Sequence, residues 1–427
     1  MAAAVSAATE AQKARFPCLI TVLERNDRTA AKVRISGGGK CNVAHRGAPK
    51  EILEKGFLRQ SEQRFLRPSL FAFNGDDLLA LLHSGGVETQ ARPDGKIFPS
   101  SGNALSVVQV FENLMSQQSV DLRLSCRVTG VFHADGRFLV QTDTGGTLEA
   151  DAVILASGGV SYARTGTTGD GLRIAGKFGH TLVTPHPALA PVHTVTPFPS
   201  ALAGLSLRKV HLIALSGKAR VERPGDVLFT HRGFSGPAVL SLSRDIAELH
   251  ASGEVRLYAD MFPEHEKEKL EKILLLQARE HGPRTVRKFL QGCPIAPPAA
   301  SFTQGEQGTI PTAIVPYILD ASAVPEDATL STLTKEQRKS LLSVLKRFPL
   351  GMVRKVPLDE GEVSAGGVSL SEVDPKTMQS RTRPGLFLCG ELLDYAGEIG
   401  GFNLQAAFST GWLAGMHAAL MNYPAQE

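Results

Sequence analysis

The chain has 427 residues, enough for two to three domains of the common size of about 100–200 residues. Hydrophobic residues make up 42% and charged residues 21%, the balance of a chain that buries a core, which excludes disorder as its dominant state. The net charge of +4 is small for this length and does not favour a nucleic-acid or membrane partner.

Cysteine usage points to a reducing compartment. The five cysteines are widely scattered and include no CxxC pair, so the sequence predicts neither a disulfide framework nor a metal site. We therefore expect a cytoplasmic protein, with import into an organelle as the alternative if the natural N-terminus lies upstream. No apolar run approaches the roughly 18 residues needed to span a bilayer.

The first residues, MAAAVSAATEAQKARF, are rich in alanine and almost free of acids. Transit peptides share this composition with helices whose small residues pack closely. We favour a helix packed against a sheet, because a strand is expected directly afterwards at 18–23, ending in Glu24. This order predicts a βαβ unit whose first strand is absent from the sequence.

Mixed helices and strands follow. Asp76 is the expected N-cap of a helix over 77–83, and another helix is expected over 103–116. The apolar run 152–156 is typical of a parallel strand that is covered on both faces. Before it come three β-type runs separated by Asp-Gly and Gly-Gly turn signals, which predict a meander of strands at 126–134, 137–142 and 147–150.

The segment 185–354 has a different character. Five prolines between 185 and 199 mark its start, and short β-type runs continue to Phe262. Pro263 is the expected first residue of a helix that ends at Gly282. Thr334 and Gln337 form the capping box of a second helix that ends near Phe348. The α/β pattern then returns with a strand over 385–391.

Three glycine-bearing turns stand where α/β folds bind ligands, beyond the carboxyl ends of parallel strands. They lie at 36–42, at 157–171 and at 390–403, where Gly400-Gly401 opens the last helix. Helix N-termini offer unpaired N–H groups, and glycine lets an anion approach the backbone. One such turn is commonly only a turn. Three in strand–turn–helix contexts predict a nucleotide site, with Glu24 either binding the adenosine ribose or solvated.

Seven segments, in order over nearly the whole chain, resemble the BaiN-like, aminoacetone-oxidase-like family of FAD-dependent oxidoreductases. They are ISGGGKCN (Ile35–Asn42), GKIFP (Gly95–Pro99), ASGGVSYARTGTTGDG (Ala156–Gly171), FTHRGFSGP (Phe229–Pro237), SAGGV (Ser364–Val368), PKTMQS (Pro375–Ser380) and GLFLCGELLDYAGEIGGFNLQAAFSTG (Gly385–Gly411).

This resemblance implies an α/β fold class. A two-dinucleotide-binding (Rossmann-like) FAD domain with a three-stranded β-meander would be interrupted by an inserted β-subdomain plus a helical portion. The implied domains are the first part of the FAD-binding domain at 1–184, the insertion at 185–354, and the second FAD-binding part at 355–427.

The sequence also departs from the family pattern. Members begin with a strand and a G-x-G-x-x-G loop, whereas this sequence begins within the helix that follows them. Ala30 and Ala31 stand where Gly-Arg is usual, Lys40 replaces an arginine, and Ala163 replaces a common proline. The absent strand would lie centrally, between the strands that end at Glu24 and near Ala156, and its loss leaves both neighbours with unpaired edges, so we expect Met1 to be a late start in a longer reading frame. The absent loop is the main pyrophosphate cradle of the family. We also expect the sequence as given to fold poorly and to lose FAD.

The resemblance implies FAD as the tight cofactor, with NAD(P)H as one compatible electron donor. Glu24 would hold the adenosine ribose, Val128 would meet the adenine edge through its backbone, and Glu391 would contact the ribityl chain or pyrophosphate. The helix that begins near Gly401 would direct its N-terminus at the N1–C2 carbonyl edge of the flavin. The implied cofactor-binding residues are Glu24, Arg25, Lys32, Ser36, Gly37, Gly38, Gly39, Cys41, Asn42, Val128, Ala156, Ser157, Gly158, Gly159, Thr165, Gly166, Asp170, Gly390, Glu391, Gly400, Gly401, Phe402, Asn403 and Leu404.

Two residues are candidates for catalysis. Cys41 lies in a loop expected near the flavin, although a free cysteine is more often a small buried residue. His231 would face the flavin from the insertion, with a structural histidine as the commoner alternative. Asp170, in a Gly-Asp-Gly sequence, is expected to cap a helix.

The expected function is flavin-mediated hydride transfer on a small molecule. One alternative is a non-catalytic relic, which the absent glycine loop favours. The other is a flavoprotein that acts on RNA, which requires a basic face that the small net charge does not favour.

Overall fold

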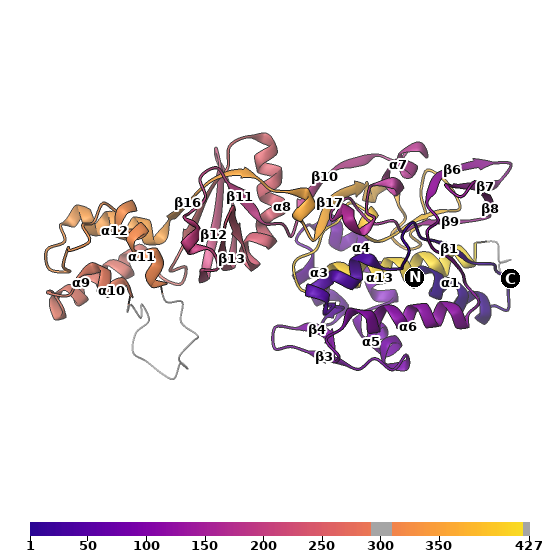
Figure 1. Ribbon diagram of the computed structural model, residues 1–427, viewed down its shortest axis with the longest axis horizontal. Coiled ribbons are helices and arrows are strands. Elements are labelled where there is room, and N and C mark those ends of the chain that lie inside the picture. Colours follow the sequence, from indigo (N-terminus) through magenta and orange to yellow (C-terminus); the bar gives the residue numbers. More distant parts are fainter. Residues whose placement is uncertain (292–309, 422–427) are drawn as a thin grey trace. The chain divides into compact units, whose positions relative to one another are not determined.

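The computed structural model describes residues 1–291 and 310–421, which divide into two compact units (Figure 1). Unit 1 comprises Met1–His186 together with Gly361–Glu427, and unit 2 comprises Pro187–Glu360. The chain thus leaves unit 1, forms unit 2 and returns. The sequence-based domain bounds 1–184, 185–354 and 355–427 remain a prediction, because compact units alone do not test which parts fold as domains.

Two pairs of parallel strands form the centre of unit 1. Strand β1 (Thr21–Leu23) pairs with β5 (Asp121–Arg123), and β9 (Val153–Leu155) pairs with β18 (Leu386–Leu388). In the second pair, Ile154 lies opposite Phe387. The strands of this pair are apolar throughout, as expected for a parallel sheet with packed faces. The expected strands around residues 18–23, 152–156 and 385–391 are confirmed, each shorter than predicted.

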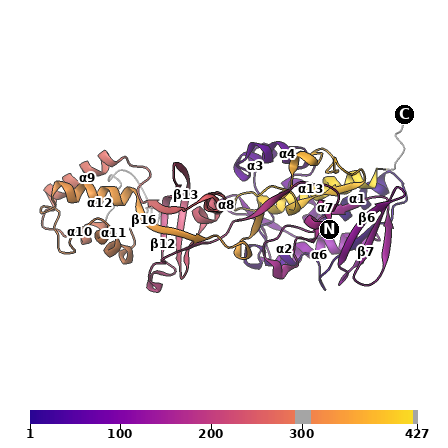
Figure 2. The same ribbon diagram turned by 90° about the horizontal axis from the view of Figure 1, so that it is seen from above.

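The N-terminal segment is a helix, α1 (Ala2–Lys13), as expected. Its small residues pack against the C-terminal helix α13 (Phe402–Ala419) rather than against a sheet (Figure 2). The Ser6 hydroxyl donates a hydrogen bond to the Trp412 carbonyl at 2.7 Å. The two helices approach closely because alanines of α1 meet glycines of α13: a Cβ added at Gly415 would overlap the Ala3 carbonyl oxygen.

The predicted meander is confirmed. Strands β6 (Val128–Ala134), β7 (Arg137–Thr142) and β8 (Thr147–Ala150) form an antiparallel sheet. Asp135 and Gly136 both have positive φ, at 50° and 80°. This is the conformation of a tight turn whose twist matches that of the flanking strands.

The starts of two helices in unit 1 confirm one prediction and contradict another. Helix α6 (Ala104–Gln117) begins after Asn103, close to the predicted start. Helix α5 (Gly75–Ser84) begins after Asn74, whose side chain accepts from the Asp77 N–H in a capping box, so the prediction of Asp76 as N-cap was wrong. The other elements of unit 1 that bear on the site are α2 (Ala31–Ile35), η1 (Ser36–Gly39), β2 (Ala44–His45), α7 (Asp170–Lys177), β17 (Val363–Val368) and η7 (Gly390–Leu392).

Unit 2 contains a closed six-stranded barrel with its own apolar core. The strands follow the order β11 (Val192–Thr194), β14 (Gly233–Ser235), β13 (Ala219–Thr230), β12 (Ser206–Ser216), β15 (Arg256–Asp260) and β16 (Phe348–Lys355). Helix α8 (Pro237–Ser252) packs against β13. The helical portion comprises α9 (Lys267–Glu280), α10 (Val286–Gln291), α11 (Val315–Ala321) and α12 (Lys335–Lys346).

Two helix predictions in unit 2 differ in outcome. The capping box of Thr334 and Gln337 is present, with both side chain–backbone hydrogen bonds formed. Helix α9, however, begins at Lys267, so Pro263 is not its first residue. Across the described residues of both units, every helix is too short or too polar to cross a membrane.

The contact between α1 and α13 is the basis of a stability prediction. We expect Gly415→Ala to destabilise the protein by about 1–3 kcal/mol, because the new methyl group meets the rigid Ala3 backbone. The matched control is Gly411→Ala in the same helix, where the added Cβ would lie at an ordinary 3.6 Å from that of Ala2. Urea unfolding of both variants measures the difference, and equal stabilities would contradict this packing.

Candidate functional site

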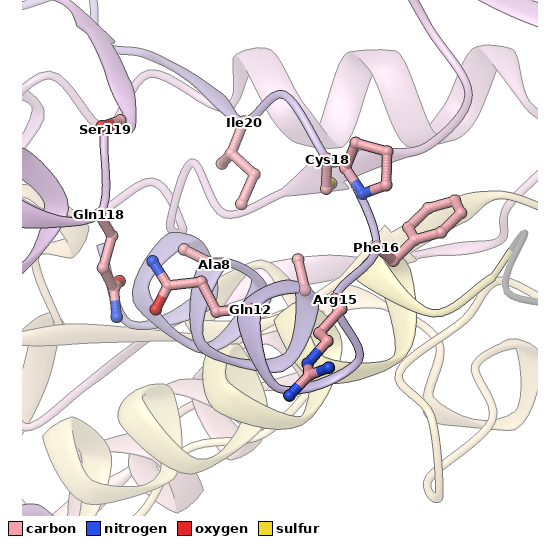
Figure 3. Close-up of a pocket in the computed structure, with 10 residues that line it drawn as sticks. Ala8, Gln12, Arg15, Phe16, Cys18, Ile20, Gln118 and Ser119 are labelled. Atoms are coloured by element: carbon pink, nitrogen blue, oxygen red, sulfur yellow. The ribbon is translucent and has the colours of Figure 1, made fainter.

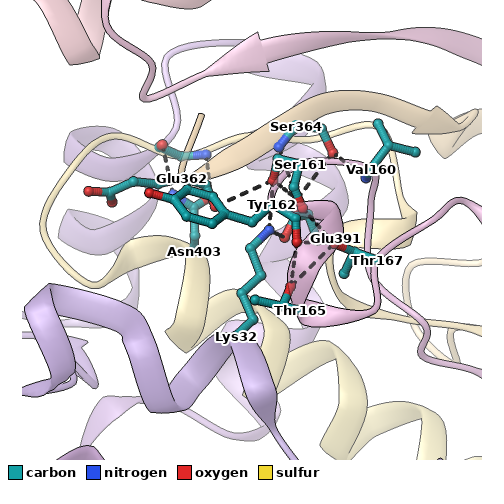
Figure 4. Close-up of polar contacts among 11 residues, drawn as sticks. Lys32, Val160, Ser161, Tyr162, Thr165, Thr167, Glu362, Ser364, Glu391 and Asn403 are labelled. Atoms are coloured by element: carbon teal, nitrogen blue, oxygen red, sulfur yellow. Dashed lines mark hydrogen bonds and ion pairs between the residues drawn. The ribbon is translucent and has the colours of Figure 1, made fainter. Parts of the chain in front are cut away.

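The Glu391 carboxylate binds three segments of unit 1 together (Figure 4). Lys32 of α2 donates to its Oε2 atom at 2.5 Å and to the Ser161 hydroxyl at 2.8 Å. The Oε1 atom accepts from the backbone N–H of Ser364 at 2.9 Å, from the Ser364 hydroxyl at 3.1 Å and from the Ser161 hydroxyl at 3.2 Å. Both oxygens of Glu391 are therefore occupied, and the group acts as an anchor rather than as a free base.

Local structure explains why this anchor forms. Glu391 lies in η7, directly after strand β18, and the N–H of Gly390 donates to the Thr410 hydroxyl of α13 at 3.0 Å. Gly159, in the turn after β9, approaches so closely that an added Cβ would overlap the Ser364 hydroxyl. This close approach accounts for glycine at 159, whereas Gly158 has a positive φ of 73°, which glycine adopts without strain.

The glycine loop 36–42 reaches the N-terminus of helix α13. Gly37, Gly38 and Gly39 all have positive φ, and a Cβ at Gly38 would meet nothing within 4 Å, so this backbone is open to close approach. Gly401 is the N-cap of α13, and its Cβ position lies 2.9 Å from the Asn42 Oδ1 atom. That oxygen is buried and has no hydrogen-bond partner among the described residues.

These two features fit the pyrimidine ring of a flavin. The ring has an N–H donor flanked by carbonyl acceptors, which complement an unpaired buried oxygen and the free N–H groups of a helix N-terminus. The adjoining loop is fixed by Asn403, whose amide forms two hydrogen bonds with the Gly397 backbone, at 2.7 and 2.9 Å. Asn42 and Gly401 would hold the ring edge, whereas the Asn403 side chain is already used within its loop.

A second ionic cluster surrounds Asp170, the first residue of α7. Arg127, just before β6, binds it through two hydrogen bonds of 2.8 and 3.1 Å. Arg25, just after β1, lies 3.5 Å from the same carboxylate, and Arg173 forms a further ion pair with it. The hydrogen bond from Arg127 is the largest cause that lowers the pKa of Asp170 to about 2. The prediction that Asp170 caps a helix was wrong: Gly169 is the N-cap of α7, and Asp170 is the first residue inside the helix.

Glu24 and its neighbours are joined to the turn that precedes Asp170. The Glu24 Oε1 atom accepts from the Asn26 N–H at 2.9 Å, and Asn26 donates to the Thr165 carbonyl at 3.1 Å. Arg25 donates to the Gly166 carbonyl at 3.3 Å. The turn at 161–170 thus contacts both the Glu391 anchor and the segment of Glu24, which makes the predicted site continuous.

The remaining predicted residues lie around these clusters. Ser36 begins η1, Ala156 and Ser157 are exposed after β9, and Val128 is half-buried at the start of β6. The Gly400 carbonyl accepts a hydrogen bond from the His45 Nδ1–H group at 3.1 Å. The His45 ring stacks on Phe402, with 4.4 Å between the ring centroids. Leu404 is half-buried in the first turn of α13.

The two candidate catalytic residues do not join the clusters. Cys41 is fully buried, and burial raises the pKa of its thiol to about 11, so a thiolate role is disfavoured. His231 belongs to unit 2 and is exposed in the turn between β13 and β14.

Sequence reasoning missed five residues that build these clusters, Asn26, Arg127, Ser161, Arg173 and Ser364. Ser161 and Ser364 stand within the quoted family segments, which was the available signal. Arg127 stands beside Val128 but carries no local pattern, because its role depends on a partner 43 positions away.

A surface pocket of about 410 Å³ lies elsewhere in unit 1 (Figure 3). It is lined by the end of α1 and the following loop, including Arg15, Phe16 and Cys18, together with Gln118 and Ser119. None of the predicted cofactor-binding residues lines it, so this pocket is separate from the candidate site.

Residues 1–417 match the family described as the HI0933-like protein Rossmann domain. The 3-dehydro-bile acid delta(4,6)-reductase of Clostridium scindens is 31% identical over 420 residues, covering 98% of this chain and 97% of that protein. The ribosomal RNA dihydrouridine synthase of Haemophilus influenzae is 27% identical over 408 residues, covering 94% of this chain and 93% of that protein. Among solved structures, the 3-ketosteroid delta1-dehydrogenase of Sterolibacterium denitrificans shares 13% identity with a TM-score of 0.48, covering 99% of this chain and 98% of that one.

The Glu391 anchor leads to a stability prediction. Glu391→Gln keeps the shape of the side chain but turns an amide group toward the Lys32 ammonium, so we expect a loss of about 1–3 kcal/mol. The double variant Lys32→Gln/Glu391→Gln removes the unpaired cation and should recover part of that loss. Denaturant unfolding of the single and double variants gives the coupling energy, and strictly additive losses would contradict the ion pair.

The Asp170 cluster leads to a pH prediction. Because the folded-state pKa is about 2 and the ordinary value is 3.8, the ionised carboxylate contributes stability that is complete above pH 4 and is lost as the pH falls toward 2. The shift corresponds to about 2 kcal/mol. Urea unfolding of the wild type and of Asp170→Asn should therefore show a gap that is constant from pH 7 to about pH 5 and narrows below pH 4. A gap that is independent of pH would contradict the ionic role.

Proposed function

Because the chain belongs to the HI0933-like Rossmann family and is an FAD-dependent oxidoreductase, we propose that it reduces a carbon–carbon double bond conjugated to a carbonyl group in a small molecule. The two curated relatives support this choice of chemistry. One is named as a delta(4,6)-reductase of a 3-dehydro bile acid and the other as a dihydrouridine synthase. Each name describes the loss of a ring double bond that lies in conjugation with a carbonyl.

The observation that carries the proposal is the buried, unpartnered Asn42 oxygen beside Gly401 at the N-terminus of α13. When bound in reduced form, FAD supplies the hydride. The first N–H groups of α13 would then stabilise negative charge on the carbonyl edge of the ring, by about 0.3–1 kcal/mol and up to about 2 kcal/mol when partly buried. Asn42 would accept the ring N–H and so fix the orientation of the ring.

The other clusters would hold the rest of the cofactor. Glu391 and Lys32 both hydrogen-bond to the Ser161 hydroxyl, in the turn whose glycines would allow close approach of the central part of FAD. The Oε1 atom of Glu24 accepts from Asn26, but none of the described residues donates a hydrogen bond to Oε2. Oε2 would therefore accept a hydrogen bond from a ribose hydroxyl. The adenine would lie against the backbone of Val128.

The reduction itself balances simply. A hydride equivalent would add to the β-carbon of the conjugated double bond and a proton to the α-carbon, and reduced flavin would supply the two electrons of that hydride. Cys41 is not the proton donor, because its thiol is fully buried. NAD(P)H is the donor class that we expect to reduce the flavin again.

A half-reaction experiment tests this function. The full chain, purified with its flavin, is reduced anaerobically with NADH, NADPH or dithionite and then mixed with 2-cyclohexen-1-one or a 3-oxo-4,6-diene steroid. We expect the flavin absorption band to return with both enones, with 2-cyclohexen-1-one converted to cyclohexanone and the steroid losing one double bond per flavin, while added cyclohexanone leaves the flavin reduced.

The other results have distinct meanings. Reoxidation only by a uridine-containing ribosomal RNA fragment would replace the small-molecule substrate with RNA. No reoxidation by any of these acceptors would overturn double-bond reduction, and a chain purified without flavin from FAD-replete cells would favour the non-catalytic alternative.

A further inference from the structure

We propose that Asp170 is the positioning residue of the adenosine end of the FAD site. It would hold three separate segments in register without touching the cofactor. This inference rests on the proposed placement of FAD, in which Glu24 binds the ribose and Val128 meets the adenine.

Each segment that Asp170 gathers carries one part of the proposed adenosine site. Arg127 directly precedes Val128 in the meander, and Arg25 directly follows Glu24 at the end of β1. Asp170 itself follows the turn that begins at Thr165. These segments are about 40 to 140 positions apart in sequence. Only tertiary contacts can therefore set the spacing between the ribose and adenine contacts.

The geometry of the carboxylate suits this role and excludes direct ligand binding. Arg127 uses its Nε and Nη2 atoms on the two oxygens of Asp170, the paired arrangement that fixes orientation as well as distance. Arg173 adds to one oxygen, and Arg25 lies 3.5 Å from the other. The Asp170 side chain is 15% exposed, so three guanidinium groups cover it and leave little of it open to a ligand.

The same contacts fix the segment of Glu24. Arg25 also donates to the Thr168 hydroxyl at 2.6 Å and to the Gly166 carbonyl, so its side chain ties β1 to the turn before α7 at three points. Meanwhile, the N–H of Cys126 donates to the Glu24 carbonyl at 2.9 Å. A closed ring of contacts thus joins the end of β1, the turn before α7 and the start of the meander. Asp170 lies where the side chains of Arg25 and Arg127 meet.

An asparagine at position 170 would break this arrangement specifically. Its amide has one acceptor oxygen in place of two and no charge, so the paired contact with Arg127 is lost and three arginines face one another without a counter-ion. The isoalloxazine end is held by different residues, Asn42 and Gly401. We therefore expect the defect to be confined to the adenosine end.

The experiment measures FAD release from the full-length holoenzyme after dilution, by the rise in free-flavin fluorescence, together with the absorption spectrum of the bound flavin. Asp170→Asn and Arg127→Gln should each speed release by about tenfold or more, with the spectrum unchanged. The double variant should release FAD no faster than the single variants, because both remove the same contact.

Two comparison variants define the readout. Glu149→Gln removes an exposed ion pair with Arg137 in the same meander and should leave release unchanged. Asn42→Leu should shift the flavin spectrum, because it acts at the ring end. Arg127→Gln keeps the inference testable if Asp170→Asn does not fold.

The proposal and its premise fail in different ways. Wild-type release rates in both Asp170→Asn and Arg127→Gln, with faster release in Glu24→Gln, would overturn the positioning role and leave the placement of FAD intact. Wild-type rates in all three would overturn the placement itself. A shifted flavin spectrum in Asp170→Asn would show that this residue lies at the ring, which also overturns the inference.

Discussion

The hydrogen-bonded Glu391 carboxylate is the constraint on which the candidate site depends. It receives a charged donor from α2, a hydroxyl from the turn after β9, and a backbone N–H and hydroxyl from β17. These segments are up to 359 positions apart, and unit 2 is inserted in the chain between two of them. A carboxylate with this many donors holds its geometry strongly, because hydrogen bonds to an ionised group are worth about 1.5–3 kcal/mol each. The return of the chain to unit 1 is thereby fixed at the site.

The parts of this fold that were predictable from the sequence are those encoded by neighbouring residues. The meander followed from Asp135-Gly136, where both residues adopt the left-handed conformation that the turn requires. The capping box of Thr334 and Gln337 followed from a spacing of three. Where two local signals competed, the prediction was wrong: Asn74 rather than Asp76 caps α5, because both can accept from helix N–H groups and only the start of the helix decides between them.

The candidate site was predictable only in outline. Glycine-rich turns after strands predicted where a ligand would bind, and the structure connects those turns through Lys32, Glu391 and Asp170. The identity of the connecting partners could not be read from the sequence, since Arg127 and Ser364 acquire their roles only when distant strands align. The packing of α1 illustrates the same limit. Its alanines predicted close packing, but whether the partner was a sheet or the glycines of α13 depended on tertiary structure.

Both central carboxylates of the site are paired with cations, and this bears on how the protein divides its work with the cofactor. Asp170 is surrounded by three arginines and has its pKa lowered to about 2, and Glu391 is paired with Lys32. A general acid or base needs a pKa near the working pH and a free oxygen or proton. The lowered pKa of Asp170 fails the first condition. Both oxygens of Glu391 already accept hydrogen bonds and so fail the second, and the thiol of Cys41 is buried with a raised pKa. These two carboxylates are therefore suited to binding and orientation, which is the contribution expected of a protein whose cofactor carries the redox chemistry.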